Sequence, residues 1–241
     1  MPLDTNASTP PVPSGPATPE SLVALAARLL DGRTIHKGRS VLGLTGPPGA
    51  GKSTLALHLV TEIDRTHGPG TAAYLPLDGF HLANAQLDRL GLRQRKGSPP
   101  SFDAHGYVAL LRRVHTERFT EVYAPGFDRT LDEPVAGRHV IHPHTRLVIT
   151  EGNYLANTDA PWSAVRPLLH ELWYVATADS VRDERLMHRH VAGGRTPEAA
   201  RAWIDGNDDP NGTYVKEGLA ACTRVVEVGC LPSSGAGGSV P

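Results

Sequence analysis

Five short apolar segments recur along the chain, and each has the character of a buried strand. They are almost continuously apolar rather than alternating, which is typical of strands in a parallel sheet covered on both faces. Segments with helical periodicity separate them, and this alternation predicts an open α/β sheet. The predicted strands are 40–45, 72–77, 146–150, 171–177 and 224–228, and the predicted helices are 52–66, 81–91, 104–116, 162–169, 179–192 and 197–205.

A first helix and a small insertion complete this pattern. Thr18 is a suitable N-cap residue, and Pro19 favours the first turn of the helix that follows. We expect that helix to end at Gly32. The apolar stretches 120–125 and 137–143 flank a turn-rich segment, so they predict a small antiparallel insertion.

The two ends of the chain differ from the rest in composition. Residues 1–17 are rich in Pro, Ser and Thr and lack apolar periodicity, and residues 231–241 are similar. Such segments bury too little apolar surface to offset the entropy of ordering, so we expect both to be disordered tails. The remaining residues, 18–230, are predicted to form a single α/β domain.

Composition narrows the class of protein. The 241 residues carry a net charge of −1, which argues against a nucleic-acid-binding surface. The two cysteines, Cys222 and Cys230, do not form a Cys-x-x-Cys pair, so neither a disulfide framework nor a zinc site is predicted. No apolar run approaches the roughly 20 residues that span a bilayer. We therefore expect a soluble, cytoplasmic protein with no membrane partner.

The most specific motif follows the first predicted strand of the sheet. Residues 46–54, "GPPGAGKST", match G-x-x-x-x-G-K-[ST], a loop whose backbone N–H groups bind phosphate oxygens. Lysine in this motif reaches the β- and γ-phosphates, and the serine that follows it ligates Mg²⁺. The motif predicts that ATP and Mg²⁺ bind here; the alternative is a Gly/Pro turn that happens to precede a helix. The candidate residues are Gly46, Gly49, Ala50, Gly51, Lys52, Ser53 and Thr54.

Two acids stand at the ends of predicted strands. Asp78 follows strand 72–77, and Glu151 follows strand 146–150. Ligands of open α/β sheets bind beyond the carboxyl ends of the strands. Glu151 is therefore predicted to hold Mg²⁺, and Asp78 to accept the proton of an attacking hydroxyl. The alternatives are that Asp78 caps the helix beginning near His81 and that Glu151 is an ordinary loop acid.

The segment 179–206 has the features of a lid. Arg185 and Arg189 lie four residues apart on one predicted helix and share a face. Gly193 and Gly194 would form a hinge, after which Arg195 precedes another helix. Arginines on such a pair could neutralise the charge of the transferred phosphoryl group, with Arg195 contacting the nucleotide. The alternative is that these arginines lie on a solvated helix face and pair with the acids Asp183 and Glu184 of the same helix.

Several residues are candidates for the pocket of the phosphoryl acceptor. Arg95 and Lys96 lie in a polar loop, where they could bind an anionic group or be solvated. Asn207 belongs to the Asn/Asp/Gly-rich stretch 207–215, which reads as a turn. The other candidates from residue type and place in the chain are His81, Tyr107, Tyr123 and Arg129.

Five motifs occur in an order that resembles a known family. They are "GPPGAGKST", "PLDGFH", "RKGSPPSFDAHGYVALL", "YAPGFDR" and "ITEGNYL". Over roughly residues 20–220, the chain is similar to the P-loop small-molecule kinases related to uridine kinase, phosphoribulokinase and bacterial-type pantothenate kinase. It most resembles their nucleoside/nucleotide kinase-like branch, whose members are often named fructose transport system kinases.

The resemblance implies a three-layer P-loop NTPase fold with a five-stranded parallel sheet, the antiparallel insertion and a helical lid. It also implies that Asp78 is the catalytic base, that Asp103 contacts sugar hydroxyls and that Glu151 is the acid of the second strand end. The Tyr- and His-containing pyrimidine pocket of uridine kinases has no clear counterpart here, which argues against uridine as the substrate.

Two classes of function are consistent with these residues. The first is a kinase that transfers the γ-phosphoryl group of ATP to a hydroxyl of a small molecule such as a sugar, a nucleoside or a pantothenate-like compound. The second is an ATP-hydrolysing switch or assembly factor that acts on a protein partner. A GTP-dependent switch is disfavoured because the chain contains no Asn-Lys pair of the kind in the guanine-binding motif. A homodimer is a further expectation, because such assemblies are common among soluble enzymes.

Overall fold

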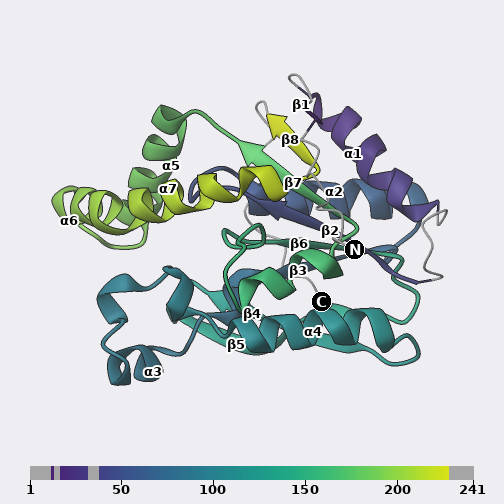
Figure 1. The fold of residues 1–241 in the computed structure, drawn as a ribbon, viewed down its shortest axis with the longest axis horizontal. Helices are drawn as coiled ribbons and strands as arrows, with labels where there is room; N and C mark the ends of the chain where they lie inside the picture. Colours follow the sequence, from purple (N-terminus) through teal and green to yellow (C-terminus); the bar gives the residue numbers. More distant parts are fainter. Residues whose placement is uncertain (1–11, 14–16, 32–37, 228–241) are drawn as a thin grey trace, which may run out of the picture.

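A parallel sheet runs through the centre of the molecule (Figure 1). The structure, a computed structural model, describes residues 12–13, 17–31 and 38–227. The strand order is β1-β8-β7-β2-β6-β3, and every neighbouring pair is parallel. The five predicted strands are all present, with their described ends within one residue of the prediction. They are β2 (Ser40–Thr45), β3 (Ala72–Pro76), β6 (Leu147–Glu151), β7 (Glu171–Ala176) and β8 (Arg224–Glu227).

The sixth strand, β1, comprises Val12–Pro13 and pairs with β8. It lies within the segment 1–17 that composition predicted to be disordered. A strand of two residues is too short to show apolar periodicity, so the sequence pattern did not predict this edge strand. Most of that segment, together with Gly32 and the predicted tail 231–241, lies outside the described residues.

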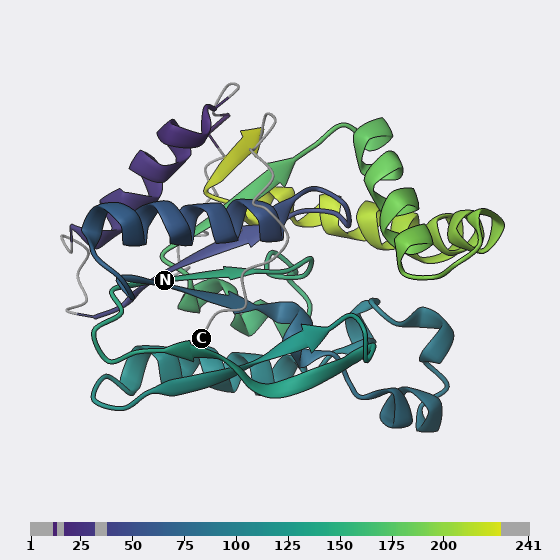
Figure 2. The same ribbon diagram turned by 180° about the vertical axis from the view of Figure 1, so that it is seen from behind.

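Apolar residues of the strands alternate between two cores. Leu42 and Leu44 of β2 face α1 (Pro19–Ala27) and α2 (Lys52–His67), whereas Val41 faces the core built around α4 (Ala104–Thr116). Figure 2 shows α2 along one face of the sheet and α4 on the opposite side. The three-layer α/β architecture expected from the sequence is confirmed, and both faces of the sheet are covered by apolar side chains.

The antiparallel insertion consists of β4 (Val122–Asp128) and β5 (Glu133–Ile141), which packs beside α4. Its strands extend further into the turn-rich segment than predicted. The Asp128 carboxylate accepts hydrogen bonds from the backbone N–H groups of Thr130 and Leu131 at 2.9 and 3.0 Å. This carboxylate closes the hairpin in a few residues, so most of the segment that looked like a long turn is strand.

Two predicted helices differ from the structure. Segment 162–169 forms two short 3₁₀ turns, η5 (Trp162–Ala164) and η6 (Arg166–Leu168), because Pro167 lacks the N–H that would continue a helix. Segment 81–91 yields the shorter α3 (Asn84–Arg89), which follows a 3₁₀ turn, η2 (Leu77–Phe80). The remaining 3₁₀ turns are η1 (Arg28–Leu30), η3 (Arg93–Arg95), η4 (Pro99–Ser101) and η8 (Gly218–Ala221).

A predicted turn also differs from the structure, at the end of the lid. It contains α5 (Asp179–Ala192) and α6 (Pro197–Trp203), as predicted, but residues 207–215 are not a turn. A π-helical turn, η7 (Ile204–Asp208), leads into α7 (Asp209–Glu217), whose first turn accommodates Pro210. The lid helices project to one side of the sheet in Figure 1. In the described part of the chain, every helix is too short or too polar to cross a bilayer.

Candidate active site

The phosphate-binding loop follows β2 and leads directly into α2, as the motif predicted. Gly49 and Gly51 have φ angles of +79° and +89°, which residues with side chains rarely adopt. A Cβ atom on Gly49 would also lie 3.0 Å from the Arg182 carbonyl oxygen of α5. Glycine at these positions lets the loop curl tightly beside the lid, with the N-terminus of α2 at the pocket.

Lys52 is the first residue of α2, and its side chain folds back over the loop. Nζ donates a hydrogen bond to the Pro47 carbonyl oxygen at 3.0 Å, and 7 % of the residue is exposed. Burial lowers the pKa of Lys52 to about 8, although the Glu151 and Asp78 carboxylates oppose the shift. A phosphate bound in the pocket would supply the negative charge that this buried ammonium group needs.

Glu151 ends β6 beside the loop, because β6 pairs directly with β2. Its Oε1 accepts hydrogen bonds from Ser53 Oγ at 3.0 Å and from the Tyr74 hydroxyl at 2.8 Å. Burial and the nearby Asp78 carboxylate raise the pKa of Glu151, whereas Lys52 and the two hydroxyl donors lower it. Sequence reasoning missed Tyr74, because a tyrosine within an apolar strand looks like an ordinary core residue.

Asp78 lies just beyond β3, in the first turn of η2, and lines the same pocket. Strand β3 is not adjacent to β2; β6 lies between them and carries Glu151 at its end. An Asp78 carboxylate oxygen lies 3.9 Å from a guanidinium nitrogen of Arg129. Among the described helices, α3 has Ala83 as its N-cap residue, so Asp78 does not cap it.

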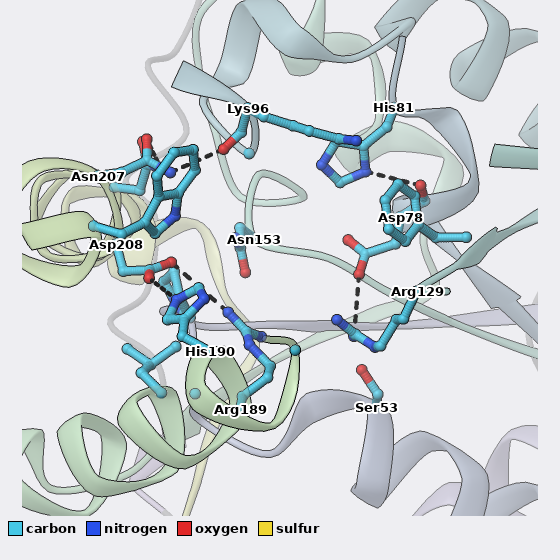
Figure 3. A pocket seen from close by; sticks show the side chains of 18 of the residues that line it. Ser53, Asp78, His81, Lys96, Arg129, Asn153, Arg189, His190, Asn207 and Asp208 are labelled. Atoms are coloured by element: carbon cyan, nitrogen blue, oxygen red, sulfur yellow. Dashed lines mark hydrogen bonds and ion pairs between the residues drawn. The ribbon is translucent and has the colours of Figure 1, made fainter. Parts of the chain in front are cut away.

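These residues surround a pocket of about 840 Å³ between the sheet, the insertion and the lid (Figure 3). Most of the predicted site residues line it. They are Gly49, Gly51, Lys52, Ser53, Thr54, Asp78, His81, Lys96, Arg129, Glu151, Arg185, Arg189, Arg195 and Asn207. Segments far apart in the sequence therefore meet at one site, at the carboxyl ends of the strands, where open α/β sheets bind their ligands.

The structure places three predicted acceptor-binding residues elsewhere. Asp103 is exposed and caps α4, where its carboxylate accepts a hydrogen bond from the Gly106 N–H at 2.8 Å. Tyr107 is fully buried, with its hydroxyl 2.7 Å from Thr150 Oγ1. Tyr123 is exposed on β4 and donates to Glu121. Each of these polar groups is engaged away from the pocket.

Three further candidates lie close to the pocket without lining it. Arg95 is exposed at the end of η3, and Arg93 and Gln94 of the same turn line the pocket in its place. Gly46 and Ala50 belong to the phosphate-binding loop but face the protein interior: Ala50 is buried, and a Cβ atom on Gly46 would meet the Val175 carbonyl oxygen at 2.7 Å. Neighbouring residues of a short turn or loop point in different directions, and sequence spacing does not reveal which of them lines the pocket.

His81 is fixed on the acceptor side of the pocket. Its Nδ1 lies 2.9 Å from the Asp78 carbonyl oxygen, and because a carbonyl only accepts, Nδ1 carries the hydrogen. The imidazole packs against Phe102 and Phe127, with ring centroids 4.0 and 5.0 Å apart. Burial lowers the pKa of His81, which favours the neutral ring with a lone pair on Nε2. Sequence reasoning missed the two phenylalanines, since aromatic residues are usually core.

The lid reaches the pocket through its arginines. Arg185 donates to the Gly49 carbonyl oxygen at 3.3 Å, and Arg189 lies 3.8 Å from Asp208. Arg195 stacks over Trp203 with its guanidinium carbon 4.0 Å from the ring centroid. The alternative was that the lid arginines pair with acids of the same helix. Asp183 of α5 instead pairs with Arg201 of α6. Other lining residues that the sequence analysis did not single out include Asn153, His190, Trp203 and Asp208.

Comparison with known proteins identifies the family. A scan of protein-family models found no match. A relative from Schizosaccharomyces pombe, provisionally named a uridine kinase, is 35% identical over 198 residues, which cover 80% of this chain and 84% of that protein. A crystal structure from Silicibacter, provisionally titled a fructose transport system kinase, is 31% identical with a TM-score of 0.76 and covers 85% of this chain and 98% of that chain.

A third comparison supports the fold alone. The structure of YFH7 from Saccharomyces cerevisiae, provisionally described as a P-loop containing kinase with a circular permutation, is 20% identical with a TM-score of 0.74 and covers 88% of this chain and 99% of that chain. The extent and identity of the first two matches, together with the intact phosphate-binding loop, are sufficient to assign the family. The chain belongs to the P-loop kinases of the uridine kinase type and is an ATP-dependent kinase.

Proposed function

We propose that the protein transfers the γ-phosphoryl group of Mg-ATP to a hydroxyl group of a small molecule. The observation that carries this proposal is that Asp78 and Lys52 line one pocket, which continues past them along His81 and Phe127. A nucleotide held by the phosphate-binding loop would leave that end of the pocket to an acceptor. Asp78 would then accept or orient the proton of the attacking hydroxyl.

Mg²⁺ fits the donor set beside the loop. Ser53 Oγ and the Glu151 carboxylate are oxygen ligands 3.0 Å apart, and Mg²⁺ typically takes one or two protein oxygens together with phosphate oxygens. The described residues contain no cluster of three or more acidic, His or Cys side chains that could form an all-protein cage. When bound, Mg²⁺ would neutralise charge on the β- and γ-phosphates. Tyr74 would orient Glu151 through its hydroxyl.

The acceptor side suits a molecule with several hydroxyl groups. Asp78 and a neutral His81 both offer hydrogen-bond acceptors, and the ring of Phe127 offers an apolar wall. Lys96 is held by an ion pair to Asp132 at 2.8 Å, so its charge is already compensated. These features support a sugar or a nucleoside over a strongly anionic acceptor.

Acceptor-dependent ADP release tests the proposal. The protein is incubated with Mg-ATP and then with sugars, nucleosides and pantothenate; one class should raise the rate of ADP formation. Asp78→Asn should keep ATP affinity and lose transfer by about 10²-fold or more, because the variant lacks a base. Asp103→Asn is the matched control, since asparagine also caps helices and Asp103 lies outside the pocket.

An ATPase that acts on a protein partner is the competing function. It predicts hydrolysis that no small molecule accelerates and that a protein raises. Near-normal turnover of Asp78→Asn would also contradict the proposed role of this carboxylate.

A further inference from the structure

Asp208 is a buried carboxylate on the lid that faces two basic side chains. It ends the π-helical turn η7, and 6 % of the residue is exposed. Its Oδ2 accepts a hydrogen bond from His190 Nε2 at 2.7 Å, and its Oδ1 lies 3.8 Å from Arg189 Nη2. Figure 3 shows both contacts, with Asp78 and Arg129 across the pocket. Each oxygen of the carboxylate thus has a different partner on α5.

Arg189 needs such a partner because it faces other positive charges. Partial desolvation lowers the pKa of its guanidinium; Asp208 opposes this shift, whereas the charge of Arg129 adds to it. The charge of Arg189 in turn contributes to the lowered pKa of Lys52. These cations converge on the space above the phosphate-binding loop. Without an anion on the lid side, repulsion would favour rotamers of Arg189 that leave the pocket.

The backbone that carries Asp208 is fixed to the acceptor side. The neighbouring Asn207 donates a hydrogen bond through Nδ2 to the Lys96 carbonyl oxygen at 2.8 Å. The π-helical turn therefore directs two successive side chains to different partners: Asn207 toward the acceptor-side loop, Asp208 toward α5. Such turns are rare and occur often at functional sites. The carboxylate thus has a defined position relative to the acceptor end of the pocket.

We propose that Asp208 is a positioning residue that holds the guanidinium of Arg189 at the phosphoryl group in transfer, with His190 fixing the carboxylate. The proposal rests on the proposed function in that Arg189 contacts the transferred group. Because its two oxygens face His190 and Arg189, Asp208 acts through Arg189 and not on the reacting groups directly. Its contribution is pre-organisation: Arg189 is in place before charge develops, so little reorganisation is needed in the transition state.

The variant Asp208→Asn separates the two contacts of the carboxylate. The amide oxygen can still accept from His190, while the amide NH₂ replaces the negative charge beside Arg189. We expect the rate of Mg-ATP hydrolysis, with water as the acceptor, to fall about tenfold while the Kd for Mg-ADP changes less than about twofold. A second measurement is the gain in Mg-ADP affinity on adding aluminium fluoride, a mimic of the transferred phosphoryl group, which should shrink by a similar factor.

Two further variants supply the controls. Asp205→Asn lies on the same turn but pairs with Arg201 at the surface, so it should leave both measurements unchanged. In the Arg189→Ala background, Asp208→Asn should have no further effect, because the side chain that it positions is gone. Thermal unfolding of each variant checks that the lid is folded.

Three outcomes would overturn the proposal. They are an equal loss from Asp208→Asn with and without Arg189, a loss of the same size in Asp205→Asn, and an unchanged response to aluminium fluoride. Because neither measurement includes a small-molecule acceptor, failure to find such a substrate would count against the proposed function and not against this role of Asp208.

Discussion

The two walls of the pocket are built on different physical principles. On the nucleotide side, α2 buries Leu55, Ala56, Leu59 and Ile63 against the sheet, and the phosphate-binding loop is fixed by its backbone. On the lid side, α5 buries Leu186 and Arg182, and α6 buries Ala200. Ion pairs at the surface also hold the lid, such as that between Arg201 and Asp183 at 2.7 Å.

This difference separates a rigid wall from one that can move. Elements with many buried apolar contacts open with nearly the full free energy of unfolding, whereas elements held by exposed polar contacts open more easily. A lid of the second kind can admit ATP and acceptor and then close over them. Substitutions on the nucleotide side should therefore affect stability and chemistry strongly, and substitutions at the lid surface should affect both weakly.

The largest effect is expected from Lys52→Met. Methionine keeps most of the buried volume but removes the charge next to the phosphates, so ATP turnover should fall by about 10²- to 10³-fold. Steady-state ADP release measures this loss. Lys216→Met is the matched control, because Lys216 pairs with Asp179 on the lid surface. Retention of more than a tenth of the turnover in Lys52→Met would contradict the nucleotide-side assignment.

A core substitution in α2 should have the next largest effect. Leu59 is fully buried against the sheet, so Leu59→Ala should lower the free energy of unfolding by roughly 2–5 kcal/mol in urea denaturation. Leu57 lies on the same helix with 43 % of the residue exposed, and Leu57→Ala should cost below about 1 kcal/mol. Equal losses would show that α2 is not held by the core as described.

Glu151→Gln should act on the metal rather than on the fold. The glutamine can still accept from Ser53 and Tyr74, but it lacks the negative charge that favours a divalent cation. We expect the Mg²⁺ concentration for half-maximal turnover to rise about tenfold or more. A titration of MgCl₂ at fixed ATP measures the shift, and an unchanged midpoint would argue for an ordinary structural acid.

The smallest effect is expected at the lid surface. Arg201 forms two hydrogen bonds of 2.7 Å to Asp183, but both side chains are 41 % exposed. Exposed ion pairs contribute little because water and salt screen them. Arg201→Ala should leave the urea midpoint close to that of the parent protein and should remove part of its dependence on salt. A loss of stability as large as that of Leu59→Ala would contradict the proposed difference between the two walls of the pocket.

Sequence patterns sufficed wherever the cause is local. Continuous apolar runs marked the strands, and the loop motif marked Lys52 and Ser53, since both signals consist of neighbouring residues. The acids Asp78 and Glu151 were found because strand ends of a parallel sheet share one edge. Asp103 and Tyr107 lie outside the pocket, and sequence spacing did not reveal this because a capping acid and a core tyrosine have the same residue types as ligand-binding side chains.

The sequence by itself determined the α/β architecture, the phosphate-binding loop and the acids at the strand ends, because periodicity and spacing encode them directly. The tertiary structure alone decided that Tyr74 contacts Glu151, that His81 lies between Phe102 and Phe127, and that Asp208 faces Arg189. Each of these contacts joins elements distant in the chain or depends on a side-chain direction. Such contacts follow from how layers and lid pack together, and no local pattern records that packing.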